Sequence, residues 1–581
     1  VNKSMQVFDS PDTLVSTSEN LMQFFDGMEY LQMSKKIREH FAGEEKPAAK
    51  PSSPSGEDKG GGNGKAKPHG HGSVKAEPAE TDETRGRKKK SSQVLELLKD
   101  HELIKFRGNP FLINGNQALE IGGLQYRDYI ARLYYLNYGS GLTENQIKET
   151  VLIQRGKALY EGTEKTVYFR NAAISETLVY IDLADGKNTI IEVTPGVWKA
   201  AENPDVVFFR PQNIGPLPFP NNPGNIEPLR NFLNLKNDQD FILIRAALPF
   251  ILRGRPGGRG SYLILLFTGP EGSAKSTAAK ILKLLVDPGT PETRTPGNDI
   301  RDFFIACFRC LVLNLDNLSH LPRDVQDAIS SIVTGGGFAR KLNYSDSEEM
   351  VFENCNPVFM TGISLKTAPD LMSRTIKLEL DPIEEMDRRT ESDIYGELEK
   401  VKSEIFGGIL TALARALAEY KKGFDVPPLP RLADFGKFSI ALERGNGYPE
   451  GEVIAALSDA YDTALEGIAE ENPLINVLLN KLIFSTEQEI SGTAGEILKI
   501  INHETDEKTQ RLEIWPKTAA GLGTIFSRQY NVLKKIGITI TKGTGRDRRK
   551  YFLSYIEPPF RGDREGESMG AEHETQSEIP F

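Results

Sequence analysis

The sequence has few cysteines, no long apolar run and no signal pattern. Only Cys307, Cys310 and Cys355 occur among 581 residues, which is too few for a disulfide framework and indicates a reducing compartment. No apolar run is long enough to span a bilayer, and residues 1–10 lack the basic-then-apolar order of a signal peptide. We therefore expect a cytoplasmic protein that does not contact a membrane.

The sequence also lacks an excess of positive charge. Its net charge of −10 excludes a protein coated in basic surface for nonspecific binding of nucleic acid, so any contact with DNA must be local. Metal ligands are sparse as well. Cys307 and Cys310 form a lone CxxC without the second ligand pair that zinc needs, so buried structural thiols are the favoured interpretation. His69 and His71 are too isolated to predict a metal site.

The chain is long enough for three or four domains, and its composition marks their order. Residues 42–92 are rich in Pro, Gly, Ser, Lys and Glu. This stretch cannot bury enough apolar surface to offset the conformational entropy that the chain would lose on folding. It ends in the basic run RGRKKK, for which a solvated linker end is favoured over a phosphate contact. We predict an amphipathic helix within 1–41, a disordered linker over 42–92, a helical module over 93–162, a small β-rich module over 163–226, an ATPase core over 227–385, a helical region over 386–470, a winged helix over 471–557 and a disordered tail over 558–581.

The most informative segment begins with the apolar run YLILLF, which predicts a central parallel strand. GPEGSAKST follows at once, and a helical pattern comes next, which is the order of a P-loop. The residues that should surround the nucleotide are Gly269, Pro270, Glu271, Gly272, Ser273, Ala274, Lys275, Ser276 and Thr277. Backbone N–H groups would cradle phosphate, Lys275 would reach the β and γ phosphates of ATP, and the Ser276 hydroxyl would bind Mg²⁺. Ala274 replaces the usual second glycine. The alternative is a Gly-rich turn with an accidental Lys-Ser.

A second apolar strand, CLVLNLD, ends at Asp316 about forty residues downstream. In a P-loop ATPase this carboxylate helps to hold Mg²⁺, and its acidic neighbour polarises the attacking water. Here the neighbour is Asn317, whose amide cannot act as a base, so another carboxylate does this work or hydrolysis is slow. The alternative for Asp316 is an ordinary capping residue.

Two further strands complete the predicted α/β core. PVFMTGI predicts a buried strand that ends in the polar Thr361, where a side chain can sense the γ-phosphate. Arg374 comes just before the last strand, and in ring ATPases such a cation reaches the site of the neighbouring subunit. Considered alone, Arg374 fits a salt-bridged surface arginine better.

The ordered set GPEGSAKST, LNLDNLS, TGGGFARKLNYSDSEEMVF, NPVFMTGI and DLMSRTIKLEL resembles the helicase-like ATP-binding proteins of phages, plasmids and integrated elements. These are similar to superfamily 3 helicases of the AAA+ class and are often linked to a primase-polymerase. The resemblance extends from about Ala118 to Ile556. It implies a ring, with the hexamer as one option, that uses ATP to move along single-stranded or forked DNA.

Position by position, the resemblance assigns Lys275 and Ser276 to phosphate and Mg²⁺, and Asp316 to the second acidic motif. Thr361 stands at the sensor position and Arg374 at the arginine finger. Residues 334–352 would form the channel hairpin, whose candidate DNA contacts are Arg340 and Lys341. Ala274, Asn317 and Thr361 depart from the helicase pattern, so nucleotide binding is better supported than strand separation. The N-terminal part has no primase signature, so a primase-polymerase would be a separate chain.

The C-terminal part predicts a winged helix. One helix starts in SGTAGEILKII, a second opens at Trp515 and extends to about Ile536, and two short strands flank a basic turn. The residues expected to neutralise DNA phosphates are Lys534, Lys535, Arg546, Arg548, Arg549 and Lys550. A winged helix used for protein contacts is the alternative.

Two main functions fit these patterns. The first is an ATP-hydrolysing DNA motor of a mobile element. The second is an ATP-switched initiator or loader that hydrolyses ATP slowly, which Asn317 favours. A defence or regulatory ATPase with the same core is a weaker third.

Overall fold

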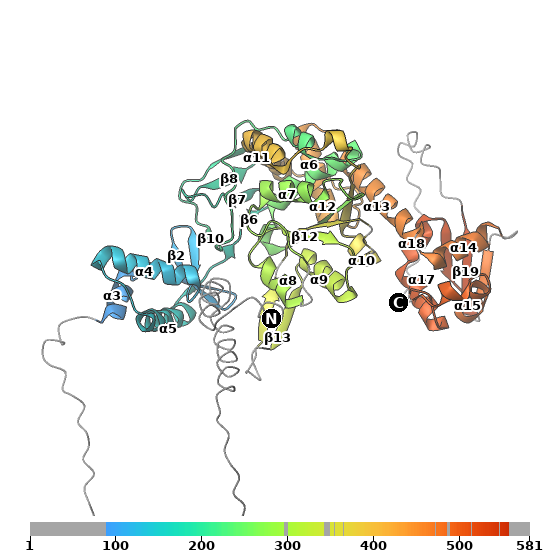
Figure 1. The fold of residues 1–581 in the computed structure, drawn as a ribbon, viewed down its shortest axis with the longest axis horizontal. Helices are drawn as coiled ribbons and strands as arrows, with labels where there is room; N and C mark the ends of the chain where they lie inside the picture. The colour runs from blue at the N-terminus through green and yellow to red at the C-terminus, as the bar shows by residue number, and fades with distance from the viewer. Residues whose placement is uncertain are drawn as a thin grey trace, which may run out of the picture. The chain divides into compact units, whose positions relative to one another are not determined.

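The computed structural model describes residues 89–295, 300–341, 349–353, 355–363, 365, 367–470, 472–484, 489–512, 514–544 and 547–556 (Figure 1). The chain divides into two units, Val1–Gly86 and Arg87–Phe581, and every described residue belongs to the second. The helix predicted within 1–41, most of the predicted linker and the predicted tail lie outside the described residues. The fold is mixed α/β.

The first described part combines helices with a sheet. Its helices are α3 (Lys90–Leu97), α4 (Leu124–Tyr138) and α5 (Glu144–Tyr160), and its first strands are β1 (Leu103–Phe106), β2 (Asn109–Asn114) and β3 (Gln117–Glu120). These strands join β4 (Thr163–Glu164), β5 (Val167–Tyr168) and β10 (Val207–Phe209) in one six-stranded sheet of order β4-β1-β2-β3-β10-β5. The expectation of a mostly helical module was therefore wrong for residues 103–120. Each strand has only four to six residues, too few to display a clear period.

Residues 163–226 contain seven strands, of which β4, β5 and β10 belong to the sheet described above. An antiparallel sheet of order β6-β7-β8-β9 contains β6 (Asn171–Ser175), β7 (Leu178–Asp182), β8 (Ile190–Thr194) and β9 (Val197–Ala200). Strands β7 and β8 pair on either side of the connection that contains Asp185. The Asp185 side chain accepts hydrogen bonds from the backbone of Lys187 and Thr189, so an Asx turn closes this connection.

The central sheet is parallel and has the order β12-β15-β11-β16. Its strands are β11 (Ile264–Thr268), β12 (Leu313–Leu318), β15 (Val358–Gly362) and β16 (Thr375–Glu379). All residues of β11 and β15 are buried, as expected for a parallel sheet covered on both faces. Leu265 and Phe267 contribute to one apolar cluster, and Ile264 and Leu266 contribute to another.

Helices cover both faces of this sheet. Figure 1 shows α7 (Lys275–Val286) on one face and α8 (Ile300–Cys307) and α9 (Arg323–Thr334) on the other. The cluster on the α7 side also contains residues of α6 (Asp238–Arg253), α11 (Glu391–Lys422), α12 (Ala433–Asn446) and α13 (Glu452–Glu470). The remaining short elements are η3 (Glu227–Phe232), η4 (Pro256–Gly258), α10 (Pro369–Met372) and η5 (Glu385–Asp387), and an antiparallel hairpin pairs β13 (Gly337–Lys341) with β14 (Glu349–Glu353).

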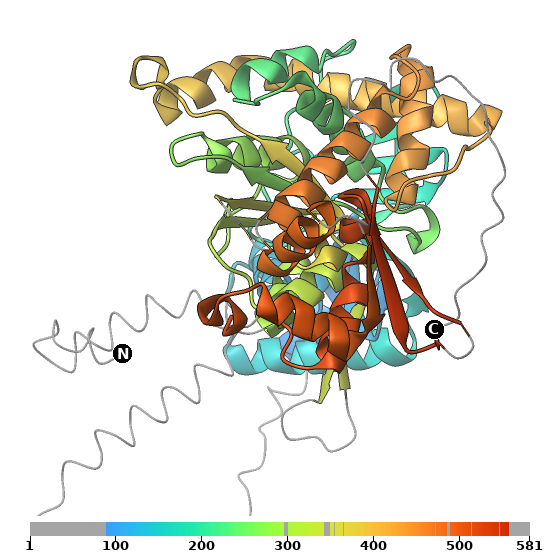
Figure 2. The same cartoon turned by 90° about the vertical axis from the view of Figure 1, so that its right-hand side faces the viewer.

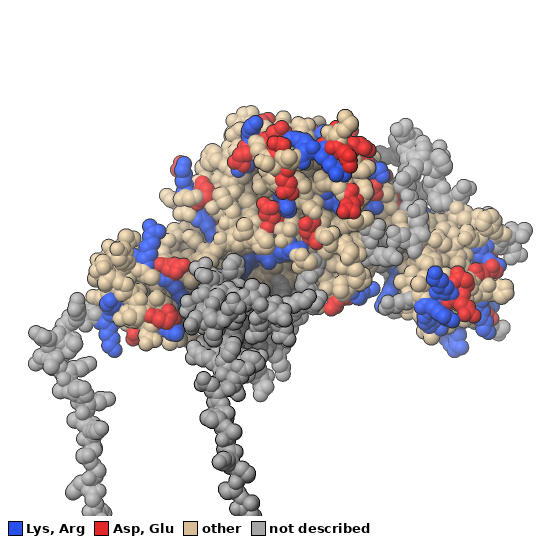
Figure 3. All heavy atoms as spheres, viewed as in Figure 1, with Lys and Arg blue, Asp and Glu red and all other residues tan. Residues whose placement is uncertain are grey.

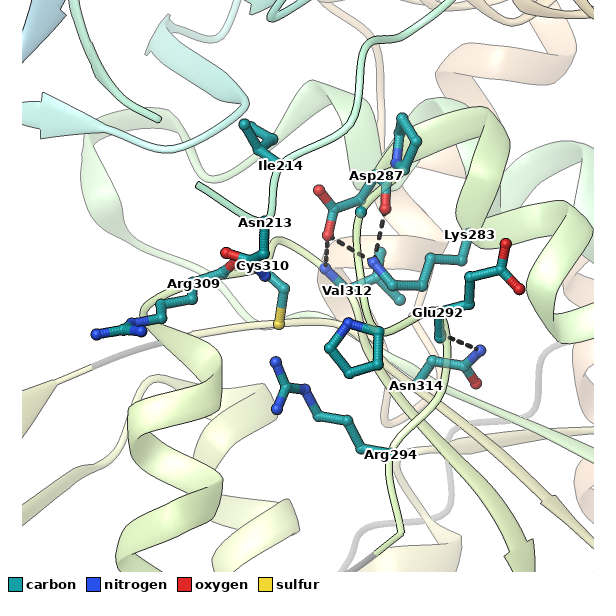
Figure 4. Close-up of a pocket in the computed structure, with 13 residues that line it drawn as sticks. Asn213, Ile214, Lys283, Asp287, Glu292, Arg294, Arg309, Cys310, Val312 and Asn314 are labelled. Atoms are coloured by element: carbon teal, nitrogen blue, oxygen red, sulfur yellow. Dashed lines mark hydrogen bonds and ion pairs between the residues drawn. The ribbon is translucent and has the colours of Figure 1, made fainter. Parts of the chain in front are cut away.

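A buried ion network joins the β6–β9 region to the end of α7. The side chain of Arg170 is fully buried, and its Nε donates to Asp287 Oδ1 at 3.3 Å. Its remaining N–H groups donate to backbone carbonyls, including those of Gly215 and Pro288. Asp287 Oδ2 in turn accepts from the backbone N–H of Leu311 and Val312 and from the Lys283 ammonium (Figure 4). One carboxylate thus satisfies donors from three segments that are distant in sequence.

This network yields a prediction for stability. Asp287→Asn should lower the free energy of unfolding by about 3–5 kcal/mol, because it leaves the Arg170 charge buried without its carboxylate. The measurement is the shift of the urea unfolding midpoint. Asp205→Asn is the matched control, since Asp205 pairs with Lys165 at 2.9 Å on the exposed surface and should shift the midpoint little. Equal shifts for both variants would contradict the assignment.

The small pocket beside Asp287 is not large enough for a nucleotide. Its volume is about 10 Å³, which is close to the space that one water molecule needs. Arg294, Arg309 and Cys310 are among its lining residues (Figure 4). Burial raises the pKa of the Cys310 thiol to about 12, and Cys307 and Cys310 are buried free thiols, as predicted. Within the described residues, no group of three His, Cys, Asp or Glu side chains could hold a metal ion.

Candidate nucleotide site

The loop between β11 and α7 begins at the carboxyl end of a buried strand, as predicted. Gly269 has φ +152°, and a Cβ at this position would lie 2.5 Å from the carbonyl oxygen of Leu380, so only glycine fits. Ala274, the N-cap residue of α7, has φ +63°. This left-handed conformation costs an alanine about 1–2 kcal/mol relative to glycine. Ala274 therefore strains the backbone, but it adopts the conformation that glycine would have at this position.

Lys275 begins α7, and its ammonium lies over the loop. Its Nζ donates to the carbonyl oxygens of Gly269 at 3.0 Å and Pro270 at 2.5 Å, and to Ser273 Oγ at 3.2 Å. Partial burial lowers the pKa of Lys275, while the carboxylates of Glu271 and Asp316 oppose that shift. The side chain is therefore a cation held at the loop by three oxygen acceptors.

Ser276, Asp316 and Thr361 form one hydrogen-bonded cluster. Ser276 Oγ donates to Asp316 Oδ1 at 2.7 Å, and Thr361 Oγ1 donates to the same oxygen at 2.5 Å. The three side chains come from α7, β12 and β15, and they meet because the carboxyl ends of parallel strands share one edge of the sheet. The structure thus brings together the predicted Mg²⁺ ligands and the predicted sensor residue.

Asn317 follows Asp316 in a strained conformation. Its φ is +57°, and the pairing of β12 with β15 is irregular between Leu315 and Leu318. The backbone N–H of Asn317 donates to Asp316 Oδ1 and to Thr361 Oγ1. Its backbone therefore orients the acid and the sensor, while its side chain is exposed.

Arg374 lies at the opposite edge of the sheet. Its carbonyl oxygen accepts from the N–H of Ile264, the first residue of β11, whereas the loop follows the last residue of that strand. At about 3.3 Å per residue the two edges are roughly 13 Å apart, so Arg374 cannot reach the loop of its own chain. Its guanidinium is 3.5 Å from Asp370, which also pairs with Arg431 at 2.7 Å.

One residue near the loop was missed by the sequence prediction. Arg388 follows η5, and its Nη2 lies 3.7 Å from the position that a Cβ on Gly272 would occupy. No motif marks it, because the contact joins two residues that are far apart in the sequence.

Two family models match the chain. Residues 261–469 match the replication protein of actinomycete integrative conjugative elements, and residues 476–560 match the C-terminal domain of the same RepA family. Together the matches cover just over half of the chain. The chain is similar to this family over these two stretches. The resemblance to mobile-element proteins is thereby confirmed at the level of a replication protein.

Three solved structures are distantly similar to the chain. The apo A form of the NrS-1 C-terminal region is 15% identical, with a TM-score of 0.34, and the match covers 80% of this chain and 98% of that one. A second apo structure of that region is 14% identical, with a TM-score of 0.35, and the match covers 81% and 100%. A JCV helicase with a bound acetamide compound is 14% identical, with a TM-score of 0.20, and the match covers 42% and 64%. These scores are too low to support an inference about mechanism. No curated protein matches the chain.

The region of the RepA C-terminal match folds around its own apolar core. An antiparallel sheet of order β17-β19-β18 contains β17 (Glu489–Thr493), β18 (Ile538–Lys542) and β19 (Lys550–Tyr555), and Figure 2 shows it in red. Its helices are α14 (Pro473–Ile483), α15 (Ala494–His503), α16 (Glu507–Gln510), α17 (Ala519–Arg528) and α18 (Tyr530–Lys535).

Two details of the C-terminal region differ from expectation. Strand β17 was not predicted, and the helix expected from Trp515 to Ile536 is two helices that begin only after the N-cap Thr518 and are separated at Gln529. Thr518 Oγ1 accepts from the N–H of Gly521, which explains where α17 begins. Trp515 instead lies in the loop before α17, and its buried indole donates to Asn502.

The predicted DNA-contacting residues have different surroundings. Arg548 and Arg549 are exposed, as is Lys534. Lys550 is 2.8 Å from Asp547, and Lys535 is partly buried and pairs with Asp462. Figure 3 shows acidic side chains among the basic ones on this region. Arg546 and the side chains of Arg340 and Lys341 lie outside the described residues, although the predicted hairpin is present in the backbone of β13 and β14.

Among the described residues, no helix is long and apolar enough to cross a membrane.

Proposed function

We propose that this replication protein is an ATP-dependent DNA motor, a P-loop ATPase of the AAA+ type related to superfamily 3 helicases. The observation that carries the proposal is the meeting of Lys275 with the Ser276–Asp316–Thr361 cluster at the carboxyl edge of one parallel sheet. This combination provides a cation for phosphate, oxygen ligands for Mg²⁺ and a polar side chain at the position of a γ-phosphate sensor.

The residues of the site fit both ATP and Mg²⁺. The N–H groups of the loop and the start of α7 would bind the phosphates, and Lys275 would exchange its loop acceptors for phosphate oxygens. Ser276 and Asp316 supply two oxygens within hydrogen-bond distance of each other, which suits an ion that takes one or two protein ligands and shares the substrate's phosphates. When bound, Mg²⁺ would neutralise charge on the transferring phosphoryl group.

The motor would be a homo-oligomeric ring, with a hexamer as one form. Since Arg374 cannot reach the loop of its own chain, it would complete the site of a neighbouring subunit. The β13–β14 hairpin would contact DNA in the ring channel through Arg340 and Lys341. The C-terminal region would be a winged helix that binds duplex or forked DNA, and a primase-polymerase would be a separate partner.

The basic turn between β18 and β19 yields a prediction for DNA binding. Replacing Arg548 and Arg549 together with alanine should reduce the slope of log K against log salt by about 2, because two phosphate contacts are lost. The measurement is fluorescence anisotropy with duplex DNA between 50 and 200 mM salt, roughly the range in which such contacts are screened. Arg511→Ala is the control, since Arg511 already pairs with Glu507. An unchanged slope would favour a winged helix used for protein contacts.

The proposed motor activity is tested by steady-state ATP hydrolysis with and without single-stranded DNA at low salt. We expect DNA to stimulate turnover, and we expect strand displacement on a forked substrate. If hydrolysis is measurable but indifferent to DNA, the motor proposal is wrong.

The surroundings of Asn317 favour a second candidate, an initiator or loader that is switched by ATP and hydrolyses it slowly. Asp316 is the only carboxylate among the groups hydrogen-bonded to Ser276 and Thr361 in the described structure, and its oxygen is already shared by both hydroxyls. An exposed amide stands where a base would be expected. DNA binding that depends on ATP, with no strand displacement and a single slow turnover, would support this candidate over the motor.

A further inference from the structure

The segment between β16 and α11 brings an arginine to the nucleotide loop of the same chain. The Arg388 guanidinium lies 3.7 Å from the Cβ position at Gly272, which has φ +78°, and apart from the chain neighbours of Gly272 no other described residue lies within 4 Å of that position. Gly272 belongs to the stretch of the loop whose N–H groups are expected to surround phosphate. Arg388 is therefore placed at the loop itself.

Both ends of this segment are fixed. Leu380 N–H donates to the Thr268 carbonyl at 2.8 Å, directly before the loop. At the other end Thr390 caps α11 by accepting from the N–H of Asp393. Nine residues separate these two anchors, which limits how far Arg388 can lie from the loop.

Arg388 and its neighbour Arg389 differ in their partners. Arg389 pairs with Glu397 at 2.5 Å. Arg388 is exposed and makes no ion pair in the part of the chain that the structure describes, although Glu384, Glu385 and Asp387 precede it closely. An exposed arginine near a phosphate-binding loop that has no ion pair within the described structure can give its donors to a ligand.

We propose that Arg388 binds the polyphosphate of the nucleotide in cis. This inference rests on the proposed function, because it assumes that the loop binds a nucleotide. A guanidinium presents paired N–H donors that match two phosphate oxygens, and such charge-assisted hydrogen bonds are stronger than neutral ones. The site would then receive two arginines of different origin: Arg388 from the chain that provides the loop, and Arg374 from its neighbour.

The test is equilibrium binding of fluorescent ADP and ATP analogues to the full chain. We expect Arg388→Ala to raise the dissociation constant about tenfold or more. Arg388→Lys should recover part of the loss, since lysine keeps the charge but not the paired donors. Arg389→Ala is the matched control and should change the constant less than about twofold, because its partner lies on α11.

The Arg374→Ala background tests whether the two arginines contribute independently. In that background Arg388→Ala should still weaken binding by the same factor. If Arg388→Ala binds nucleotide like the native chain while Lys275→Ala does not, the inference is wrong and the proposed ATPase stands. If the native chain itself binds neither analogue, the proposed function fails and the inference fails with it. Unchanged thermal unfolding of Arg388→Ala would show that the loss is not one of folding.

Discussion

Lys275→Ala should reduce ATP turnover by about 100-fold or more. Among the described residues, the Lys275 ammonium is the one side-chain cation that bonds directly to the loop oxygens, and it would follow the β and γ phosphates into the transition state. Removing one preorganised hydrogen-bond donor that faces developing charge typically lowers the rate by about 10²–10³, because it raises the activation free energy by roughly 3–4 kcal/mol. The measurement is steady-state phosphate release at saturating ATP, combined with the dissociation constant for an ATP analogue.

Lys280→Ala is the matched control for this variant. Lys280 lies on the same helix and is only loosely paired with Glu292 at 3.9 Å, so its loss changes the charge of α7 without touching the loop. We expect turnover within about twofold of the native chain. A comparable loss in both variants would point to a general effect of charge on α7, and an active Lys275→Ala would refute the assignment of the loop.

The nucleotide loop and the strand that carries Asp316 could be predicted because each is encoded by a short continuous stretch of sequence. Nine consecutive residues, a preceding apolar strand and a following helix are enough to specify the Lys275 position. Asp316 and Thr361 could be predicted as neighbours because each ends a buried strand, and the ends of parallel strands meet at one edge. The sequence also placed Arg374 just before the last strand. Since Thr375 pairs with Ile264 in the parallel sheet, Arg374 lies at the edge opposite to the nucleotide loop.

The features that were missed depend on contacts between distant segments. Arg170 and Asp287 are 117 positions apart, and neither belongs to a motif. The position of Arg388 depends on how the segment after β16 returns to the loop. The strands of residues 103–120 are too short for their alternation to compete with the helical pattern around them, and pairing with β4, β5 and β10 stabilises them only in the folded protein.

Arg374→Ala should lower ATP turnover by about 10³-fold or more while nucleotide binding stays close to native. An arginine supplied from a neighbouring subunit stabilises charge that develops in the transition state, and such residues contribute 10³–10⁵ in rate. The expected loss of turnover has a different cause from that in Lys275→Ala. Arg374 lies at the opposite edge of the sheet from the nucleotide loop of its own chain. Arg431→Ala is the control. It removes the other cation that pairs with Asp370, so it tests whether the loss reflects that ion pair.

A mixture of the two inactive variants gives the decisive result. When Lys275→Ala and Arg374→Ala chains assemble together, some interfaces combine the intact loop of one chain with the intact arginine of the other. Those interfaces should recover turnover that neither variant has alone, and the recovered fraction should peak near equal amounts of the two chains. If Arg374 acted within its own chain, the loop and the arginine would never be intact together, and mixing would recover nothing. Recovery therefore requires an active site shared between subunits, which a monomeric nucleotide switch does not have.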